Sequence, residues 1–184
     1  MTRAAPAPSI GNMRVDLTAR LWAALLWAAL LLVAAALPAW AQSPLVAELR
    51  VWATRYHENP QKIDELRAAL EQAAQAVPEL DTLLALSQAC FIYGDVRAKT
   101  TEEKLEAYDR GRQMAKRAVE LAPRSAAARF WYGTNTGRWG QTKGVMRSLF
   151  LLPTVKDAME AALELDPAFA PVYALGGTIY YEVP

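Results

Sequence analysis

The side chains best suited to bind a ligand lie together between residues 132 and 147. They combine aromatic, amide, hydroxyl and cationic groups, and they are Tyr132, Asn135, Thr136, Arg138, Trp139, Lys143 and Arg147. An arginine can hold a carboxylate through two parallel hydrogen bonds, and a nearby tryptophan supplies an apolar wall. The stretch therefore predicts a site for an organic acid, a peptide terminus or an acidic partner. The alternative is that Trp131, Trp139 and Phe150 pack in the core or in an interface while the cations cover polar rims.

Residues that usually carry catalysis or bind metals are scarce. His57 is the only histidine and Cys90 the only cysteine, whereas zinc sites of the usual kind need several such ligands. His57 follows Tyr56 at a polar helix end, which favours a solvated imidazole. Cys90 lies in an apolar run, which favours a buried and inert thiol. We therefore expect neither a metal nor a cofactor.

Motifs that bind nucleotide phosphates are also missing, since neither GxxxxGK[ST] nor GxGxxG occurs. Carboxylates are abundant, but pairs such as Glu103 with Glu106 and Asp157 with Glu160 have the spacing of a solvated helix face. The sequence thus predicts a protein that is not an enzyme. A carboxylate-dependent enzyme is the alternative from a different functional class.

The first 41 residues have the features of an export signal. Three arginines precede an uncharged apolar run at residues 21–37, and Ala39-Trp40-Ala41 has the small-x-small form of a signal-peptidase site. We expect cleavage after Ala41 and a periplasmic or otherwise exported protein, with Met13 as a possible alternative start. The competing interpretation is that residues 21–37 anchor the chain in the inner membrane, although 17 residues is at the short limit for a span.

The charge of the remaining chain is nearly balanced. Taking the three arginines and one aspartate of residues 1–41 from 20 basic and 19 acidic residues leaves 17 and 18. Proteins that bind nucleic acids usually carry a pronounced basic excess. We therefore expect a protein or small-molecule partner and no nucleic acid.

An internal repeat indicates the architecture of residues 42–184. AVELAPRSAAARFWYG at 118–133 is similar to ALELDPAFAPVYALGG at 162–177, with an offset of 44 residues. Each copy contains the end of an amphipathic helix, a proline at a corner and the start of the next helix. Such periodicity is typical of stacked helical repeats, because one helix pair cannot bury its apolar face alone.

Apolar periodicity and capping residues predict about seven helices and an all-α fold. The first begins at Ser43-Pro44, with one apolar face expected at Leu45, Leu49, Trp52 and Tyr56. The second begins after Asn59-Pro60, with a buried stripe expected at Ile63, Leu66, Leu70 and Ala74. Gly94-Asp95 is expected to stop the third helix. Thr100 with Glu103 forms a capping box at the start of a helix over 102–121, whose apolar stripe includes Tyr108. Four glycines after residue 132 predict that the next helix becomes irregular after Arg138. Residues 145–152 are expected to separate two repeats. The sixth helix is expected to begin at Pro153, and the seventh to cover residues 168–181. Because the last one is apolar and has no following partner, we expect a C-terminally truncated fragment or a contact with another chain, such as a homo-oligomer.

Two sequence patterns resemble known families. The pattern Ala-x-x-x-Ala-Leu-Glu-Leu-x-Pro at 158–167 resembles tetratricopeptide repeats. A more specific pattern resembles the branch that contains the periplasmic T-component proteins of TRAP transporters and the regulator of microtubule dynamics proteins. Its elements are Trp131-Tyr132-Gly133 through Gly144, then Leu149-Phe150, and the helix end Glu164-Leu165-Asp166-Pro167. This resemblance covers roughly residues 60–184.

The resemblance implies an all-helical superhelix that acts as a scaffold or holds a ligand. T-component proteins are thought to form oligomers with a central pore and to help deliver solutes to the transporter. They are commonly lipoproteins, whereas no cysteine follows the export signal here. We therefore predict an exported, non-enzymatic helical-repeat scaffold that binds a protein partner or a small ligand. A T-component-like accessory role in solute transport is the alternative.

Overall fold

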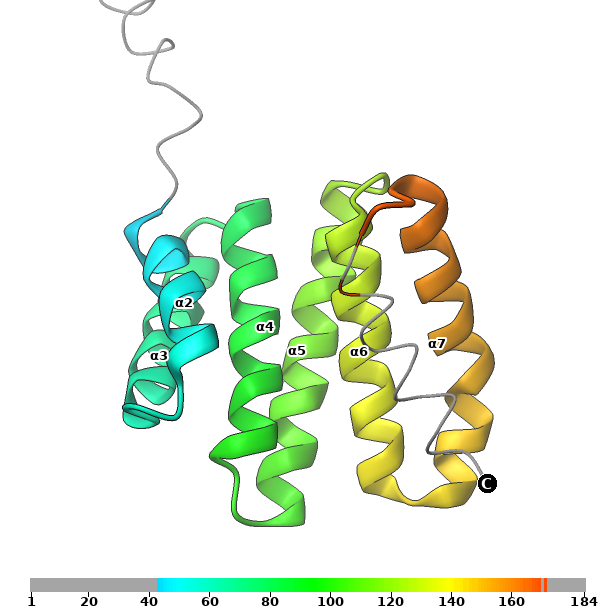
Figure 1. The fold of residues 1–184 in the computed structure, drawn as a ribbon, viewed down its shortest axis with the longest axis horizontal. Coiled ribbons are helices and arrows are strands. Elements are labelled where there is room, and N and C mark those ends of the chain that lie inside the picture. Colours follow the sequence, from blue (N-terminus) through cyan, green and yellow to red (C-terminus); the bar gives the residue numbers. More distant parts are fainter. Residues whose placement is uncertain (1–42, 170, 172–184) are drawn as a thin grey trace, which may run out of the picture. The chain divides into compact units, whose positions relative to one another are not determined.

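The computed structural model describes residues 43–169 and residue 171. The chain divides into the units Met1–Ala41 and Gln42–Pro184, and all of the described residues belong to the second. They form six α-helices and no β-strand (Figure 1), which confirms the predicted all-helical fold. The helices are α2 (Pro44–Arg55), α3 (Gln61–Ala76), α4 (Leu80–Val96), α5 (Thr101–Leu121), α6 (Ala126–Lys143) and α7 (Val145–Leu165). The predicted export signal and nearly all of the predicted helix at 168–181 lie outside the described residues.

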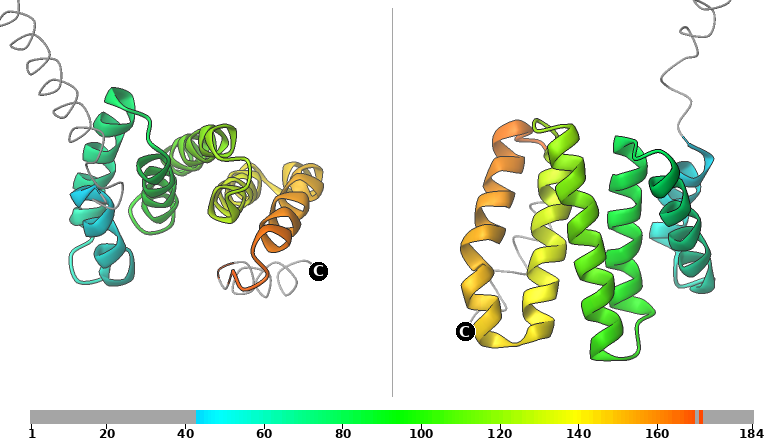
Figure 2. Two further views of the ribbon diagram at one scale, coloured as in Figure 1. Left: turned by 90° about the horizontal axis from the view of Figure 1, so that it is seen from above. Right: turned by 180° about the vertical axis from the view of Figure 1, so that it is seen from behind.

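Consecutive helices form antiparallel neighbours joined by short connections (Figure 1). Helix α4 also contacts α2 and α6, so α2, α4 and α6 form one layer. Helices α3 and α5 lie in a second layer, and α7 packs against α6 (Figure 2). This alternation between two layers is the arrangement expected of stacked helical hairpins, each of which covers the apolar face of its neighbour.

Apolar stripes on the helices form the core. The stripe predicted for α3 is confirmed, because Ile63, Leu66, Leu70 and Ala74 are all buried. They belong to a cluster that extends from α2 to α6, and a smaller cluster around Phe130 joins α6 to α7. In α2 the buried residues are Val46 and Leu49, whereas Tyr56, which was expected on the same face, is exposed beyond the end of the helix. Buried apolar stripes of this kind supply most of the stability of such helices.

The capping box at the start of α5 is confirmed. The Glu103 amide donates a hydrogen bond to Thr100 Oγ1 over 3.1 Å, and the Thr100 amide donates to Glu103 Oε2 over 3.2 Å. Accepting backbone N–H groups, first from Lys99 and then from Thr100, lowers the pKa of the Glu103 carboxyl group. The two side chains thereby satisfy backbone donors that have no partner within the helix.

The predicted irregular segment after Arg138 is wrong, because α6 runs without interruption to Lys143. The glycines in this helix allow close packing against α7. A Cβ atom at Gly133 would lie 2.8 Å from Met159 Cε and 3.0 Å from Ala158 Cβ, and one at Gly140 would lie 3.1 Å from Leu151 Cδ1. Contacts between the helices thus offset the low helix propensity of glycine. The chain turns at Gly144, whose φ of 111° is unfavourable for residues with a side chain.

The prediction that a helix begins at Pro153 is also wrong. Helix α7 begins directly after Gly144 and continues through Pro153. A proline inside a helix leaves the carbonyl four residues earlier, here that of Leu149, without its usual donor. Pro153 and Leu149 are both exposed, so water can satisfy this carbonyl group. Residues 145–152, which were expected to separate two repeats, are therefore the first half of one long helix.

Gly94 marks a third difference from the sequence-based expectation. Gly94-Asp95 was expected to stop the helix, but α4 continues to Val96. The aromatic ring of Tyr108 on α5 packs so closely against Gly94 that a Cβ atom would overlap it, with Tyr108 Cζ only 2.7 Å away. The glycine is therefore a packing residue inside the helix rather than its end.

No helix among the described residues is long and apolar enough to cross a membrane. Residues 21–37, for which a membrane anchor was the alternative prediction, are not among them.

We expect Gly94→Ala to lower the free energy of unfolding by about 1–3 kcal/mol, because the new methyl group forces the Tyr108 ring to move. Gly137→Ala is the matched control, since its Cβ atom would lie 3.6 Å from Val155 Cγ2, an ordinary contact. That change should raise the free energy of unfolding by up to about 1 kcal/mol through helix propensity. Urea denaturation followed by circular dichroism measures both, and equal effects would contradict the packing role of Gly94.

Candidate functional site

The structure divides the predicted site residues among three environments. Asn135 and Thr136 are buried between helices, Arg138 lines a pocket beside α4, and Trp139 lies among cations from α5 and α7. Tyr132 is half-buried, and its backbone carbonyl accepts a hydrogen bond from Thr136 Oγ1. All of these residues except Arg147, which lies on α7, come from the continuous helix α6, so neighbours in sequence face different directions.

Asn135 connects three helices. Its Nδ2 donates hydrogen bonds to Ser87 Oγ over 3.1 Å and to the Trp131 carbonyl over 3.1 Å. Ser87 Oγ in turn donates to the Gly111 carbonyl over 2.9 Å. Asn135 and Ser87 are both fully buried. The structure therefore places Asn135 and Thr136 in the helix packing, where Asn135 holds α6 against α4 and α5.

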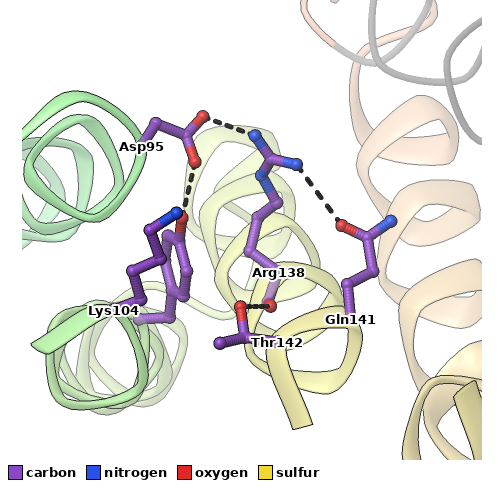
Figure 3. Close-up of a pocket in the computed structure, with 6 residues that line it drawn as sticks. Asp95, Lys104, Arg138, Gln141 and Thr142 are labelled. Carbon is purple, nitrogen blue, oxygen red and sulfur yellow. Dashed lines mark hydrogen bonds and ion pairs between the residues drawn. The ribbon is translucent and has the colours of Figure 1, made fainter. Parts of the chain in front are cut away.

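Arg138 lines the pocket that we call the Asp95 pocket (Figure 3). The pocket has a volume of about 280 Å³ and lies where the end of α4 meets the start of α5 and the last turns of α6. Its lining residues are Asp95, Lys104, Tyr108, Arg138, Gln141 and Thr142. All six are polar or charged, so the pocket suits a polar ligand and not an apolar one.

Asp95 organises this pocket. Its Oδ1 accepts a hydrogen bond from Tyr108 Oη over 2.6 Å, and its Oδ2 lies 2.7 Å from Arg138 Nη2 (Figure 3). Burial raises the pKa of the Tyr108 hydroxyl group, and the hydrogen bond to Asp95 raises it further. Tyr108 therefore stays protonated as a donor at neutral pH, and Asp95 fixes the position of the Arg138 guanidinium.

Trp139 lies in a separate cluster of cations. Arg112 Cζ on α5 is 5.0 Å from the centroid of its ring, Lys143 Nζ is 5.5 Å away and Arg147 Cζ on α7 is 6.0 Å away. Cations at these distances are attracted to the electron-rich face of an indole. Of the three, Arg112 also pairs with Asp109. The cluster therefore concentrates positive charge where α5, α6 and α7 meet.

The first half of α7 exposes an unusual amount of apolar surface next to this cluster. Val145 is 76% exposed and Phe150 is 73% exposed, and Met146, Leu149 and Leu152 are also exposed. Contiguous exposed apolar side chains of this size commonly mark interaction sites. We call this region the α7 surface, defined by Val145, Met146, Leu149, Phe150 and Leu152 together with Trp139, Lys143 and Arg147.

The two residues with the most reactive side chains take no part in either region. His57 is exposed beyond the end of α2. Its ring centroid lies 6.0 Å from that of Tyr56, and the two rings are arranged edge to face. Cys90 is buried in the core, and burial raises the pKa of its thiol to about 12. Among residues 43–169 and 171, no group of His, Cys, Asp and Glu side chains could hold a metal ion.

Sequence reasoning missed Asp95, Lys104 and Tyr108. They lie on α4 and α5, at least 30 residues before Arg138. Asp95 was interpreted as part of a helix stop and Tyr108 as part of an apolar stripe. The pairing of the buried Tyr108 with Asp95, the residue that directly follows Gly94, has no signal in a single sequence, because it depends on how α4 and α5 pack.

The fold and these two regions define an all-helical, repeat-like protein with a polar pocket and a cationic-apolar surface. The family model described as regulator of microtubule dynamics protein 1-3 matches residues 45–184, and the chain belongs to this family. The match begins within α2 and covers every later helix. No curated protein and no solved structure matches the chain.

We expect the hydrogen bond between Tyr108 and Asp95 to contribute about 1.5–3 kcal/mol, as is usual for a partly buried bond to a charged acceptor. A double-mutant cycle with Tyr108→Phe and Asp95→Ala, measured by urea denaturation, gives the coupling energy. The control cycle uses Arg55 and Glu58, whose side chains are 53% and 42% exposed. Its coupling energy should be clearly smaller, because water and salt screen an exposed ion pair. Coupling energies of similar size would contradict the organising role of Asp95.

The stability of the protein should fall as pH rises from the ordinary thiol pKa of 9.0 towards 12, because of Cys90. In this range the unfolded chain loses the thiol proton while the folded chain keeps it, so alkali favours unfolding by up to about 1.4 kcal/mol per pH unit. Unfolding measured at several pH values should show a flatter profile for Cys90→Ala. Parallel profiles would mean that the thiol is accessible in the folded protein.

Proposed function

We propose that this protein is a non-enzymatic helical-repeat scaffold whose α7 surface binds an acidic amphipathic helix of a protein partner. The observation that carries the proposal is the juxtaposition of exposed apolar side chains on α7 with the cations around Trp139. Membership of the regulator of microtubule dynamics family supports a regulatory rather than a catalytic role. The predicted export signal adds a periplasmic or otherwise exported location to the proposal.

The charge of the α7 surface supports an acidic partner. From residue 141 to residue 155 the chain contains Lys143 and Arg147 and no aspartate or glutamate. Lys143 and Arg147 are exposed. Their charged groups lie 5.5 Å and 6.0 Å from the centroid of the Trp139 ring. Carboxylates of a partner would approach a surface of positive potential. Such a potential speeds the association of acidic partners and repels basic ones.

The shape of the α7 surface supports a helical partner. The exposed face of a helix offers ridges and grooves into which the side chains of another helix can pack. Val145, Met146, Leu149 and Phe150 recur at the spacing of such ridges. A partner helix with apolar residues on one face and acidic residues beside them would bury the apolar residues and pair with the cations.

A T-component-like accessory role in solute transport is the second candidate. The observation that favours it is the Asp95 pocket, whose size and cations suit a small solute better than a protein. The sequence resemblance to T-component proteins adds to it. This role would use the pocket instead of the α7 surface, so the two candidates predict effects of different substitutions.

We expect the purified protein to bind a designed helical peptide with leucines on one face and glutamates flanking them. A peptide of the same pattern with lysines in place of the glutamates should not bind. Arg147→Glu and Phe150→Ser should each weaken binding at least tenfold, about 1.4 kcal/mol, by removing charge or apolar contact. Lys156→Glu is the matched control, because Lys156 lies on the same helix beyond the α7 surface and pairs with Glu160. Isothermal titration calorimetry measures all five combinations.

Equal binding of the two peptides, or equal loss with Lys156→Glu, would contradict the proposal. Sedimentation of the protein alone, with anionic vesicles and with polymerised tubulin tests three other occupants of this surface. A different result is a protein that fails to bind the peptide and yet self-associates, binds vesicles or binds tubulin. If Phe150→Ser abolishes that interaction, the occupant of the α7 surface is that second copy, membrane or polymer and not a helical partner.

A further inference from the structure

We propose that the Asp95 pocket binds a small carboxylate that carries one negative charge. The pocket is formed by three helices, and its residues are separate from those of the α7 surface. Arg138 pairs with Asp95 of α4, whereas its neighbour Trp139 contacts Arg147 of α7. The inference therefore does not depend on the helical partner proposed above.

The carboxylate of Asp95 is already occupied by groups of the protein. One of its oxygens accepts from Tyr108 and the other from Arg138. Its role is to hold the guanidinium in place, as a fixed arginine loses less conformational freedom when it binds an anion. Arg138 Nη1 donates a hydrogen bond to Gln141 Oε1 over 3.4 Å (Figure 3). Because Gln141 lines the pocket, this side of the guanidinium group lies at the pocket.

Lys104 supplies a second positive charge. It lines the same pocket, its side chain is half-buried, and it forms no ion pair with any residue in the described part of the chain. Among the described residues, two cations and one carboxylate line the pocket, and their net charge is +1. One carboxylate ligand would neutralise this charge, whereas a dianion would leave an excess negative charge in a partly enclosed space.

The volume of the pocket limits the size of the ligand. If each water takes about 30 Å³, the pocket of about 280 Å³ holds about nine waters. A ligand of roughly ten non-hydrogen atoms or fewer therefore fits within the pocket. The hydroxyl of Thr142, the amide of Gln141 and the hydroxyl of Tyr108 line the walls. These groups favour a short acid with a polar substituent. Beside an apolar chain they would lose hydrogen bonds to water without gaining new ones, which costs free energy.

The test is calorimetric titration of the full chain with acetate, lactate, succinate and inorganic phosphate at neutral pH and constant ionic strength. We expect saturable binding of lactate, weaker binding of acetate, and at least tenfold weaker binding of succinate and phosphate. Lys104→Gln and Arg138→Gln should each weaken lactate binding at least tenfold. Lys116→Gln should leave it unchanged, because Lys116 is an exposed lysine of the same helix outside the pocket.

The thermal unfolding of each variant is also measured by circular dichroism. Lys104 forms no ion pair in the described part of the chain, so Lys104→Gln should melt like the wild type and separate loss of binding from loss of folding. If none of the four anions shows saturable binding, the inference is overturned. Equal effects of Lys116→Gln and Lys104→Gln would overturn it too, since they would indicate general attraction of anions. Preference for phosphate would overturn the assignment to a monocarboxylate. None of these outcomes bears on peptide binding at the α7 surface.

Discussion

Helix α6 contacts α4, α5 and α7 together, and the rest of the structure depends on how closely it approaches them. Small or polar residues make each approach possible. Gly133 faces Ala158 and Met159 of α7, and Asn135 lies against Gly111 of α5, where any side chain on the glycine would overlap the amide group. Interiors packed this densely transmit small changes in volume. The hydrogen bonds of Asn135 to Ser87 then fix the register of α6 against α4.

The uninterrupted course of α6 also determines how the functional residues are distributed. Because successive residues of a helix point about 100° apart, Arg138 reaches Asp95 and the pocket while Trp139 reaches the cations of α5 and α7. A break after Arg138 would have removed this separation. One short stretch of sequence therefore contributes to two independent regions. One is a polar pocket, and the other is an apolar surface with a cationic rim.

Family membership and geometry give complementary information about this protein. The family model covers the helices from α2 onwards and identifies the chain with proteins described as regulators of microtubule dynamics. Fold alone does not specify function, because unrelated activities use the same architecture. The choice among a helical protein partner, a transporter and a cytoskeletal polymer therefore depends on the chemistry of the α7 surface and the Asp95 pocket. These two regions use different residues, so they can be tested separately.

The sequence by itself determined the elements whose signals are local. The stripe of α3 and the capping box at Thr100 and Glu103 were predicted correctly, because apolar periodicity and capping act over only a few residues. The all-helical class and the stacking of hairpins followed from the repeat. The scarcity of histidine and cysteine was equally visible in the sequence.

Only the tertiary structure decided the course of α6 and α7 and the composition of the pocket. Glycines and Pro153 predict breaks when each residue is judged alone, yet contacts with a neighbouring helix and hydration of an exposed carbonyl keep both helices continuous. Asp95 and Tyr108 lie 13 residues apart in sequence, and Arg138 follows Asp95 by 43 residues. Their meeting depends on the packing of three helices, and packing is a property of the whole fold that no local pattern encodes.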